Sequence, residues 1–205
     1  MSKKGRIHIY TGEGKGKTTA SLGLALRAVG QGFKVFIIQF MKGGAYTGEY
    51  ISAKNFLPNL EIIQFGRPCL KQQKQLKLNN IDLDNPPFDF IREEINCGDC
   101  RYCFLNDEIQ KDYVEEAFKK TEEIISQNQH NLIILDEINL AVSLGFLEVE
   151  RVVELLRNKP EQVEVVLTGR NAPKELFQLA DLVTEMKLHK HYFEDGVLAR
   201  RGIEY

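Results

Sequence analysis

The residues best suited to chemistry form one glycine- and lysine-rich segment near the N-terminus. It follows a predicted strand, opens a predicted helix and reads Thr11-Gly12-Glu13-Gly14-Lys15-Gly16-Lys17-Thr18-Thr19. Glycines let successive backbone N–H groups face one concavity, and the helix N-terminus adds positive partial charge, so such a segment can hold phosphate. A lysine at position 17 can reach the phosphates, and the hydroxyl of Thr18 can bind Mg²⁺.

This phosphate loop fits a nucleoside triphosphate, although the usual pattern has glycine where this chain has Thr11. The simpler alternative is a glycine-rich turn that only connects strand to helix. We predict that the following residues bind the nucleotide: Gly12, Glu13, Gly14, Lys15, Gly16, Lys17, Thr18 and Thr19.

A second chemical signal is a pair of carboxylates at the end of an apolar run. The run LIIL ends in Asp136-Glu137. Carboxylates placed after a buried strand organise the metal ion and its water in phosphate-loop folds. We therefore predict that Thr18, Asp136 and Glu137 bind Mg²⁺. A helix cap or a solvated acidic pair is the alternative, since such sequences are common by chance.

Strands alternating with helices must position these residues. The predicted strands cover residues 6–10, 34–40, 60–65, 132–135, 164–167 and 182–188, and helical spacing covers 106–127 and 148–158. An apolar stripe of Leu22, Ala25, Leu26 and Val29, closed by Gly30 and Gly32, predicts a helix between the first two strands. The pattern predicts one α/β domain over residues 1–205, similar to P-loop NTPases. Its sheet is mostly parallel, helices cover both faces, and ligands bind at the carboxyl ends of the strands.

Composition excludes several classes of protein. The 205 residues carry 27 Lys and Arg against 29 Asp and Glu, a net charge of −2, which is too balanced for a protein that binds nucleic acid or anionic lipid over a broad surface. No apolar run reaches the length of a membrane span, and the basic N-terminus lacks a signal-peptide apolar region. We expect a cytoplasmic protein whose four cysteines are thiols or metal ligands.

Two regions depart from the strand–helix rhythm. Residues of about 66–105 form a predicted irregular excursion that holds Cys69, Cys97, Cys100 and Cys103. Three of these thiols have CxxC spacing and could bind Zn²⁺ or an iron–sulfur cluster with Cys69 as the fourth ligand, or all four could stay free. In the tail, Asp195-Gly196 between apolar flanks predicts a hairpin. The HxH pair of His189 and His191 lies on a predicted strand, where both would share one face; surface histidines are favoured over metal ligands.

The chain resembles the P-loop type of ATP:corrinoid adenosyltransferases. The matching stretches are IYTGEGKGKTTASLGLALRAVGQGFKV with FIIQFMKGG, LIILDEINLAVSLGFL, VVLTGRNAP with ADLVTEM, and KHYFEDGVLARRGIEY. They occur in family order and cover most of the chain outside residues 51–131. The cysteine-rich segment is not part of the usual family pattern.

The resemblance implies transfer of the 5′-deoxyadenosyl group of ATP to the Co(I) of a corrinoid, with release of triphosphate. It implies that Lys17, Thr18 and Glu137 are catalytic, with Glu137 preferred for Mg²⁺. Further residues of this chain also match family positions, and the resemblance implies that some of them contact the nucleotide or the corrinoid: Arg27, Gln39, Lys42, Arg170 and Arg201. The alternative is that they are solvated side chains on the surface. It also implies a homodimer supplied with electrons by a reductant such as a reduced flavoprotein. A [4Fe–4S] cluster on the cysteines could relay that electron.

Two other functions fit the same nucleotide site. One is a nucleoside kinase similar to thymidine kinase, which also joins a phosphate loop to a Cys₄ zinc site. The other is an ATP-dependent corrinoid carrier or metal-binding regulator that has lost the chemistry. The products of the reaction distinguish all three functions.

Overall fold

The computed structural model describes residues 4–43, 47–68, 102 and 105–204. Within them, six strands form one sheet in the order β3-β2-β4-β5-β1-β6, and all pairings are parallel. The strands are β1 (Ile7–Thr11), β2 (Val35–Phe40), β3 (Leu60–Phe65), β4 (Leu132–Asp136), β5 (Glu164–Thr168) and β6 (Leu182–Glu185). The predicted parallel α/β fold is confirmed. Only the last predicted strand is clearly too long, since β6 ends at Glu185.

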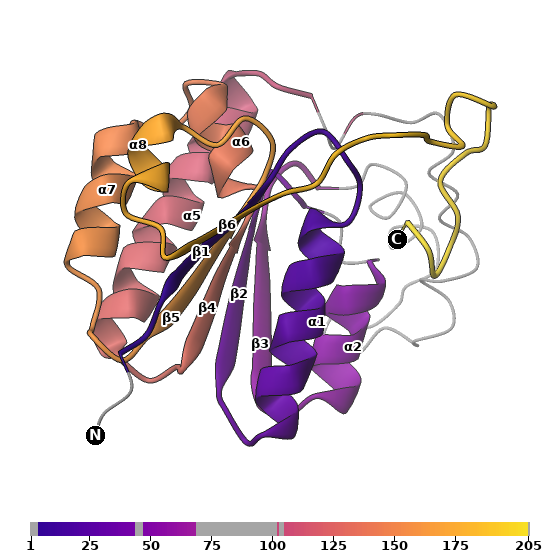
Figure 1. Cartoon of the computed structure of the whole chain (residues 1–205). Coiled ribbons are helices and arrows are strands. Elements are labelled where there is room, and N and C mark those ends of the chain that lie inside the picture. The colour runs from indigo at the N-terminus through magenta and orange to yellow at the C-terminus, as the bar shows by residue number, and fades with distance from the viewer. Residues whose placement is uncertain (1–3, 44–46, 69–101, 103–104, 205) are drawn as a thin grey trace, which may run out of the picture.

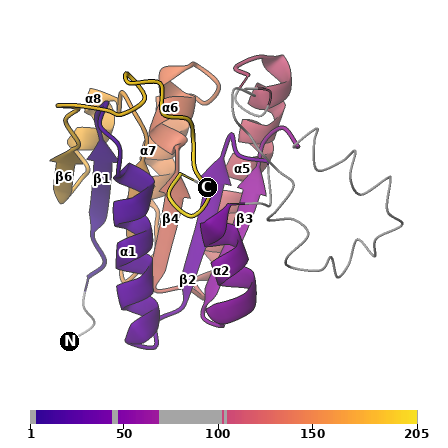
Figure 2. The same cartoon turned by 90° about the vertical axis from the view of Figure 1, so that its right-hand side faces the viewer.

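Helices cover both faces of the sheet (Figures 1 and 2). One face carries α1 (Lys17–Gly30) and α2 (Gly48–Phe56), and the other carries α5 (Glu108–Gln127), α6 (Ile138–Ser143), α7 (Val149–Arg157) and α8 (Lys174–Phe177). The predicted helices over 106–127 and 148–158 are confirmed as α5 and α7. No helix was predicted for α2, α6 or α8: α6 and α8 have only six and four residues, and α2, although as long as α7, lacks a clear apolar stripe. None of the helices in the described part of the chain is long and apolar enough to cross a bilayer.

Two apolar cores hold the helices on the sheet. On the face of α1 and α2, alanines at 25, 28 and 53 pack against Val35, Ile37 and Ile134. On the opposite face, Phe118 of α5 and Leu156 of α7 belong to a larger core that also includes Ile9, Phe40 and Leu135. All six residues of β2 are buried, as expected for a parallel strand covered on both faces.

The apolar stripe predicted for α1 is partly wrong. Its buried residues are Lys17, Ser21, Ala25 and Ala28, while Leu26 is 59% exposed. Leu22 and Val29 of the predicted stripe are partly buried against the core, so Leu26 alone of the stripe turns outward. The small side chains of the buried serine and alanines let the helix lie close to the sheet. The predicted end of α1 is confirmed: Gly32 has a φ of 79°, and its N–H donates to Val29.

The predicted hairpin in the tail is also wrong. Around Asp195-Gly196 the chain makes successive turns, in which the N–H groups of Glu194 and Asp195 donate to His191 and Tyr192, three residues earlier. No strand follows β6 within the described residues. Since β6 ends at Glu185, His189 and His191 do not share a strand face, and the His191 Nδ1 accepts a hydrogen bond from the Phe193 N–H at 3.0 Å.

At the amino ends of β1 and β6, the carboxylate of Asp181 makes contacts whose contribution to stability depends on pH. This carboxylate accepts from the Ile7 N–H at 3.0 Å and pairs with Arg6 at 2.7 Å, and these two contacts lower the pKa of Asp181 below 3.8. A lowered carboxyl pKa stabilises the fold above the unfolded pKa, and this stabilisation is lost as pH falls through the folded one.

We therefore expect Asp181→Asn to lower the free energy of unfolding at pH 7 by less than about 1 kcal/mol, because the pair is partly exposed and screened. The difference from the parent should shrink as pH falls below 4, which urea unfolding at several pH values would measure. A difference that is constant with pH would contradict this assignment.

Candidate nucleotide and metal site

The phosphate loop lies between β1 and α1 at the carboxyl end of the sheet. Lys17 is 7% exposed, and its ammonium donates to the carbonyls of Gly12 at 2.6 Å and Gly14 at 2.8 Å. Burial lowers the pKa of Lys17. Gly12 and Gly16 have φ values of 99° and 114°, which favour glycine. The sequence therefore forms a curled loop closed around a buried cation.

The loop also needs glycine because another segment packs on it. A Cβ atom at Gly12 would lie 2.5 Å from the Met186 carbonyl oxygen, and one at Gly14 would lie 2.7 Å from it. The Gly14 N–H donates to the same carbonyl at 2.7 Å. The chain that leaves β6 thus braces the phosphate loop from one side.

Asp136, at the end of β4, is the most densely bonded side chain of the site. It is fully buried, and its Oδ1 accepts from the hydroxyls of Thr18 at 2.8 Å and Thr168 at 2.6 Å. Its Oδ2 accepts from Gln39 at 3.0 Å and from the Lys42 ammonium at 2.6 Å. Burial alone would raise the pKa of Asp136, but Lys42 and the hydroxyl donors lower it. Asp136 is therefore a carboxylate held by four donors.

Glu137 follows directly and faces the cavity. Its φ of 67° lies in the left-handed region, and its N–H donates to the Thr168 hydroxyl at 3.0 Å. Burial, together with the negative charge of Asp136, raises the pKa of Glu137. A carboxylate in this setting gains from a nearby cation, because the cation offsets both effects.

The oxygen ligands of this site fit Mg²⁺. Thr18 donates its proton to Asp136, so the lone pairs of its oxygen are free for a cation beside Glu137. Among the described residues, no group of three or more His, Cys, Asp or Glu side chains could hold a metal ion. Mg²⁺ commonly takes only one or two carboxylates and completes its shell with phosphate oxygens and water.

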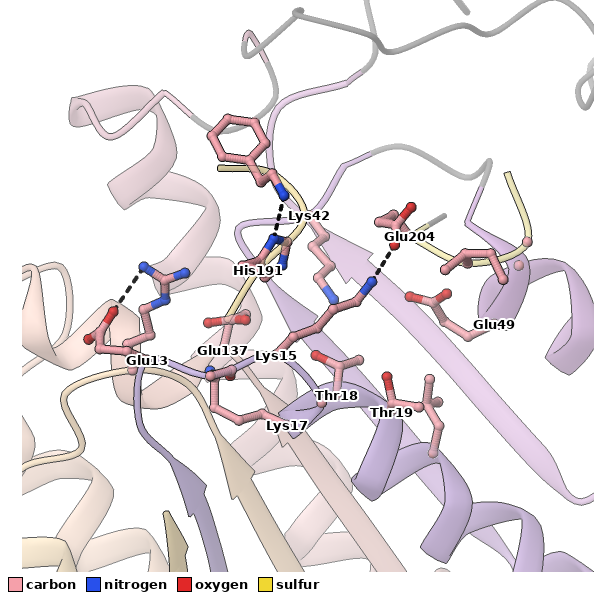
Figure 3. Close-up of a pocket in the computed structure, with 18 of the residues that line it drawn as sticks. Glu13, Lys15, Lys17, Thr18, Thr19, Lys42, Glu49, Glu137, His191 and Glu204 are labelled. Carbon is pink, nitrogen blue, oxygen red and sulfur yellow. Dashed lines mark hydrogen bonds and ion pairs between the residues drawn. The ribbon is translucent and has the colours of Figure 1, made fainter. Parts of the chain in front are cut away.

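A cavity of about 930 Å³ opens beside the loop (Figure 3). Its charged side carries Lys15, Lys17, Lys42 and Glu137, and Figure 3 shows Glu49 of α2 facing the loop. The apolar lining comes from α1, from the chain between the end of α2 and the first residue of β3, and from the tail. Its residues are Leu22, Leu26, Leu57, Leu60, Leu188, Phe193 and Ile203. The cavity is thus polar at the phosphate loop and apolar on the walls, and large for a nucleotide alone.

The remaining predicted residues lie at different distances from this cavity. Arg170 lines it and pairs with Glu13 at 3.1 Å. Gln39 lies fully buried behind Asp136, so it orients the carboxylate rather than lining the cavity. Arg27 lies exposed in the last turn of α1, away from the loop, and Arg201 lies exposed beside Gly202, which lines the cavity. The structure brings neither Arg27 nor Arg201 into the cavity lining.

Comparison with known proteins identifies the family. The model of the ATP:corrinoid adenosyltransferases BtuR/CobO/CobP matches residues 3–111 and 91–205. The chain belongs to this family. A corrinoid adenosyltransferase of Sinorhizobium sp is 34% identical over 99% of this chain and 81% of its own length. Those of Pseudomonas aeruginosa and Escherichia coli K12 are 29% and 30% identical, over 99% and 100% of this chain and 85% and 88% of their own lengths.

Membership of the adenosyltransferase family bears on the rival functions. Because the chain belongs to a family of ATP:corrinoid adenosyltransferases, the two alternative functions, nucleoside kinase and carrier without turnover, are not favoured. The chain is therefore an enzyme of the transferase class. The predicted metal ligands Cys69, Cys97, Cys100 and Cys103 lie outside the described residues.

Sequence reasoning missed Thr168, which belongs to the family stretch Leu-Thr-Gly-Arg and is fully buried. Its hydroxyl donates to Asp136 and accepts from the Glu137 N–H, so one side chain links both carboxylate residues. The available signal was its position: a polar residue that ends an apolar strand lies at the same edge as the phosphate loop. Glu49 and Gln64, which contact Gln39 at 3.1 and 2.7 Å, had no comparable signal.

We expect Thr168→Val to destabilise the fold by about 1–3 kcal/mol, because it removes one of the hydrogen bonds to the buried Asp136 carboxylate and leaves the Glu137 N–H without its acceptor. Mg²⁺ affinity in the presence of ATP should fall about tenfold, as for other residues that orient metal ligands. Urea unfolding and Mg²⁺ titration would measure the two effects. Thr168→Ser keeps the hydroxyl and serves as the control; equal values for the two variants would contradict the role of the hydroxyl.

Proposed function

We propose that this enzyme transfers the 5′-deoxyadenosyl group of ATP to the Co(I) of a corrinoid and releases triphosphate. In this reaction the Co(I) electron pair forms a cobalt–carbon bond at C5′. The bond from C5′ to the triphosphate oxygen breaks and leaves its electron pair on that oxygen. The observation that carries the proposal is the convergence of the phosphate loop, Asp136 and Glu137 on one cavity, in a member of the adenosyltransferase family.

The residues of the site have roles that follow from this charge movement. Negative charge grows on the leaving triphosphate, so Lys17 and the loop N–H groups stabilise the transition state more than bound ATP. Thr18 and Glu137 would hold Mg²⁺, with Asp136 orienting Thr18. Bound Mg²⁺ would supply further positive charge to the triphosphate. No protein base is needed, because cobalt is the nucleophile and the remaining task is alignment.

In this proposal the nucleotide is bound by the loop residues Gly12 to Thr19 together with Lys42 and Arg170. Nucleotide or corrinoid binding by Arg27, Gln39 and Arg201 remains a prediction. The apolar walls of the cavity suit the ring faces of a corrinoid. Electrons for Co(I) would come from a reductant such as a reduced flavoprotein, and we also propose a homodimer in the cytoplasm.

The cysteines are proposed to bind Zn²⁺ or a [4Fe–4S] cluster. Support comes from contacts at both borders of the cysteine-rich region. Arg67 donates to the Tyr102 hydroxyl at 3.2 Å and forms an ion pair with Asp107, so residues that precede Cys69 in sequence contact the residue between Cys100 and Cys103. Metal analysis of anaerobically purified protein tests this proposal. Iron or zinc present in the parent and lost from Cys97→Ser would support it, and neither metal in the parent would exclude it.

Mixing the protein with ATP, Mg²⁺ and chemically reduced cobalamin tests the reaction itself. We expect a light-sensitive cobalt–carbon product and one free triphosphate for each product formed. Formation of ADP and a nucleotide would indicate a kinase, and corrinoid binding without either product would indicate a carrier. The chemically reduced substrate removes any dependence on the electron donor, so a negative result concerns the transfer step alone.

A further inference from the structure

The tail of the chain contacts the phosphate loop through a cluster of four side chains, which we call the tail clasp: Lys15, Tyr192, Arg200 and Glu204. The Lys15 ammonium pairs with Glu204 (Figure 3). It also donates to the Tyr192 hydroxyl at 2.7 Å. The Tyr192 hydroxyl also donates to Glu204. Arg200 binds the same carboxylate through its backbone N–H at 2.7 Å and its Nε at 3.2 Å.

The tail clasp shields the carboxylate of Glu204 from solvent. The Glu204 side chain is 16% exposed, against 40% for Lys15. Burial would raise the pKa of Glu204, but Arg200, Lys15 and Tyr192 hold it far below its usual range, so the carboxylate stays charged. Both cations of the clasp also lie over the Tyr192 ring, at 5.4 Å for Lys15 and 4.8 Å for Arg200.

Lys15 is the point at which the tail is held. Within the described residues, every hydrogen bond and ion pair that joins residues 188–204 to the rest of the chain ends on its ammonium. The tail nevertheless forms a wall of the cavity, with His191, Phe193 and Ile203 in the lining. Many of its apolar side chains are exposed, among them Ile203 at 60%, so packing adds little to its attachment.

The position of Lys15 creates a conflict with the nucleotide. It lies in the phosphate loop, two residues before Lys17, and its only anionic partner among the described residues is Glu204. A triphosphate carries several negative charges and would compete with Glu204 for the same ammonium. A carboxylate that stayed beside those phosphates would repel them.

We propose that Glu204 and Tyr192 are positioning residues that close the tail over the cavity by holding Lys15, and that a bound triphosphate opens the clasp by taking Lys15 from Glu204. This inference rests on the proposed function, because the ligand that opens the clasp is the phosphate chain of the nucleotide. Opening moves the tail wall away from the cavity that it lines together with the phosphate loop.

Hydrogen–deuterium exchange of residues 192–204 tests the proposal, with inorganic tripolyphosphate as the probe. In the parent protein, saturating tripolyphosphate should increase exchange in the tail. In Glu204→Gln, exchange should be high without ligand and change little on its addition. Tripolyphosphate affinity of this variant should rise about fivefold, because a competing partly exposed carboxylate is gone.

Two further variants separate the clasp from a general change of charge. Glu194→Gln removes the same charge from an exposed residue of the same wall and should leave exchange as in the parent. Lys15→Ala should free the tail as Glu204→Gln does, but weaken tripolyphosphate binding instead of strengthening it. If Lys15→Ala and Glu204→Gln both release the tail but change tripolyphosphate affinity in opposite directions, loss of structure alone does not explain the result.

The inference is overturned if tripolyphosphate binds the parent and reduces exchange in the tail or leaves it unchanged. It is also overturned if Glu204→Gln behaves like Glu194→Gln in both measurements. In either case the proposed transfer reaction stands. Failure of the parent to bind tripolyphosphate would instead contradict the phosphate site, and with it both the opening step and the proposed function.

Discussion

Replacing Lys17 with alanine is expected to lower kcat/KM for adenosyl transfer by about a hundred- to a thousandfold, the usual loss when one preorganised electrostatic donor to a developing anion is removed. The ammonium already lies inside the loop, on the carbonyls of Gly12 and Gly14, so it need not be ordered when charge develops on the triphosphate. The effect should appear with chemically reduced cobalamin, in which electron supply plays no part. The rate of cobalt–carbon bond formation measures it.

The matched control for this variant is Lys119→Ala, which removes an exposed lysine from α5, distant from the cavity. Its rate should equal that of the parent. Lys17 also bonds two loop carbonyls, so the free energy of unfolding is measured for both variants. Parent-like turnover in folded Lys17→Ala would contradict the assigned phosphate site.

Asp136→Asn is expected to give the largest loss of stability, about 3–5 kcal/mol, as for other buried ion pairs that lose one partner. The substitution leaves the Lys42 ammonium without its carboxylate partner. The Lys42 side chain is 20% exposed and that of Asp136 only 1%. It also alters the bonds from Thr18 and Thr168, so Mg²⁺ binding should be lost as well. Urea unfolding measures the stability.

A double variant tests whether the unpaired ammonium causes this loss. Asp136→Asn combined with Lys42→Met should be more stable than Asp136→Asn alone, because the second change removes the uncompensated charge. Asp112→Asn on the exposed face of α5 should stay within about 0.5 kcal/mol of the parent. Additive effects of the two substitutions at 136 and 42 would contradict the coupling.

The sequence predicted the elements of this protein where the pattern is local. A strand buried on both faces must be apolar throughout, so β2 and β4 were recognisable from their composition, and the glycines of the phosphate loop indicated its turn and the start of α1. The helices α6 and α8 were missed because one or two turns carry no clear period, and the tail was wrongly predicted as a hairpin because a local turn signal does not show whether flanking strands pair. Leu26 of α1 was wrongly assigned to the buried stripe because a stripe of alanine and serine also packs a helix on a sheet.

Which side chains meet was decided by the tertiary structure. β2 and β5 flank β4 in the sheet order, and the pairing of Gln39 with Asp136 places the donors of two strands on one carboxylate. The tail returns to the phosphate loop across 189 positions of sequence, from Lys15 to Glu204. Local periodicity is set by neighbours a few residues apart, whereas these contacts depend on strand order and on the path of the chain after β6. Local patterns in the sequence therefore predict the fold, the phosphate loop and its acidic pair, whereas the hydrogen bonds of Asp136 and the contacts of Lys15 depend on how the distant segments meet.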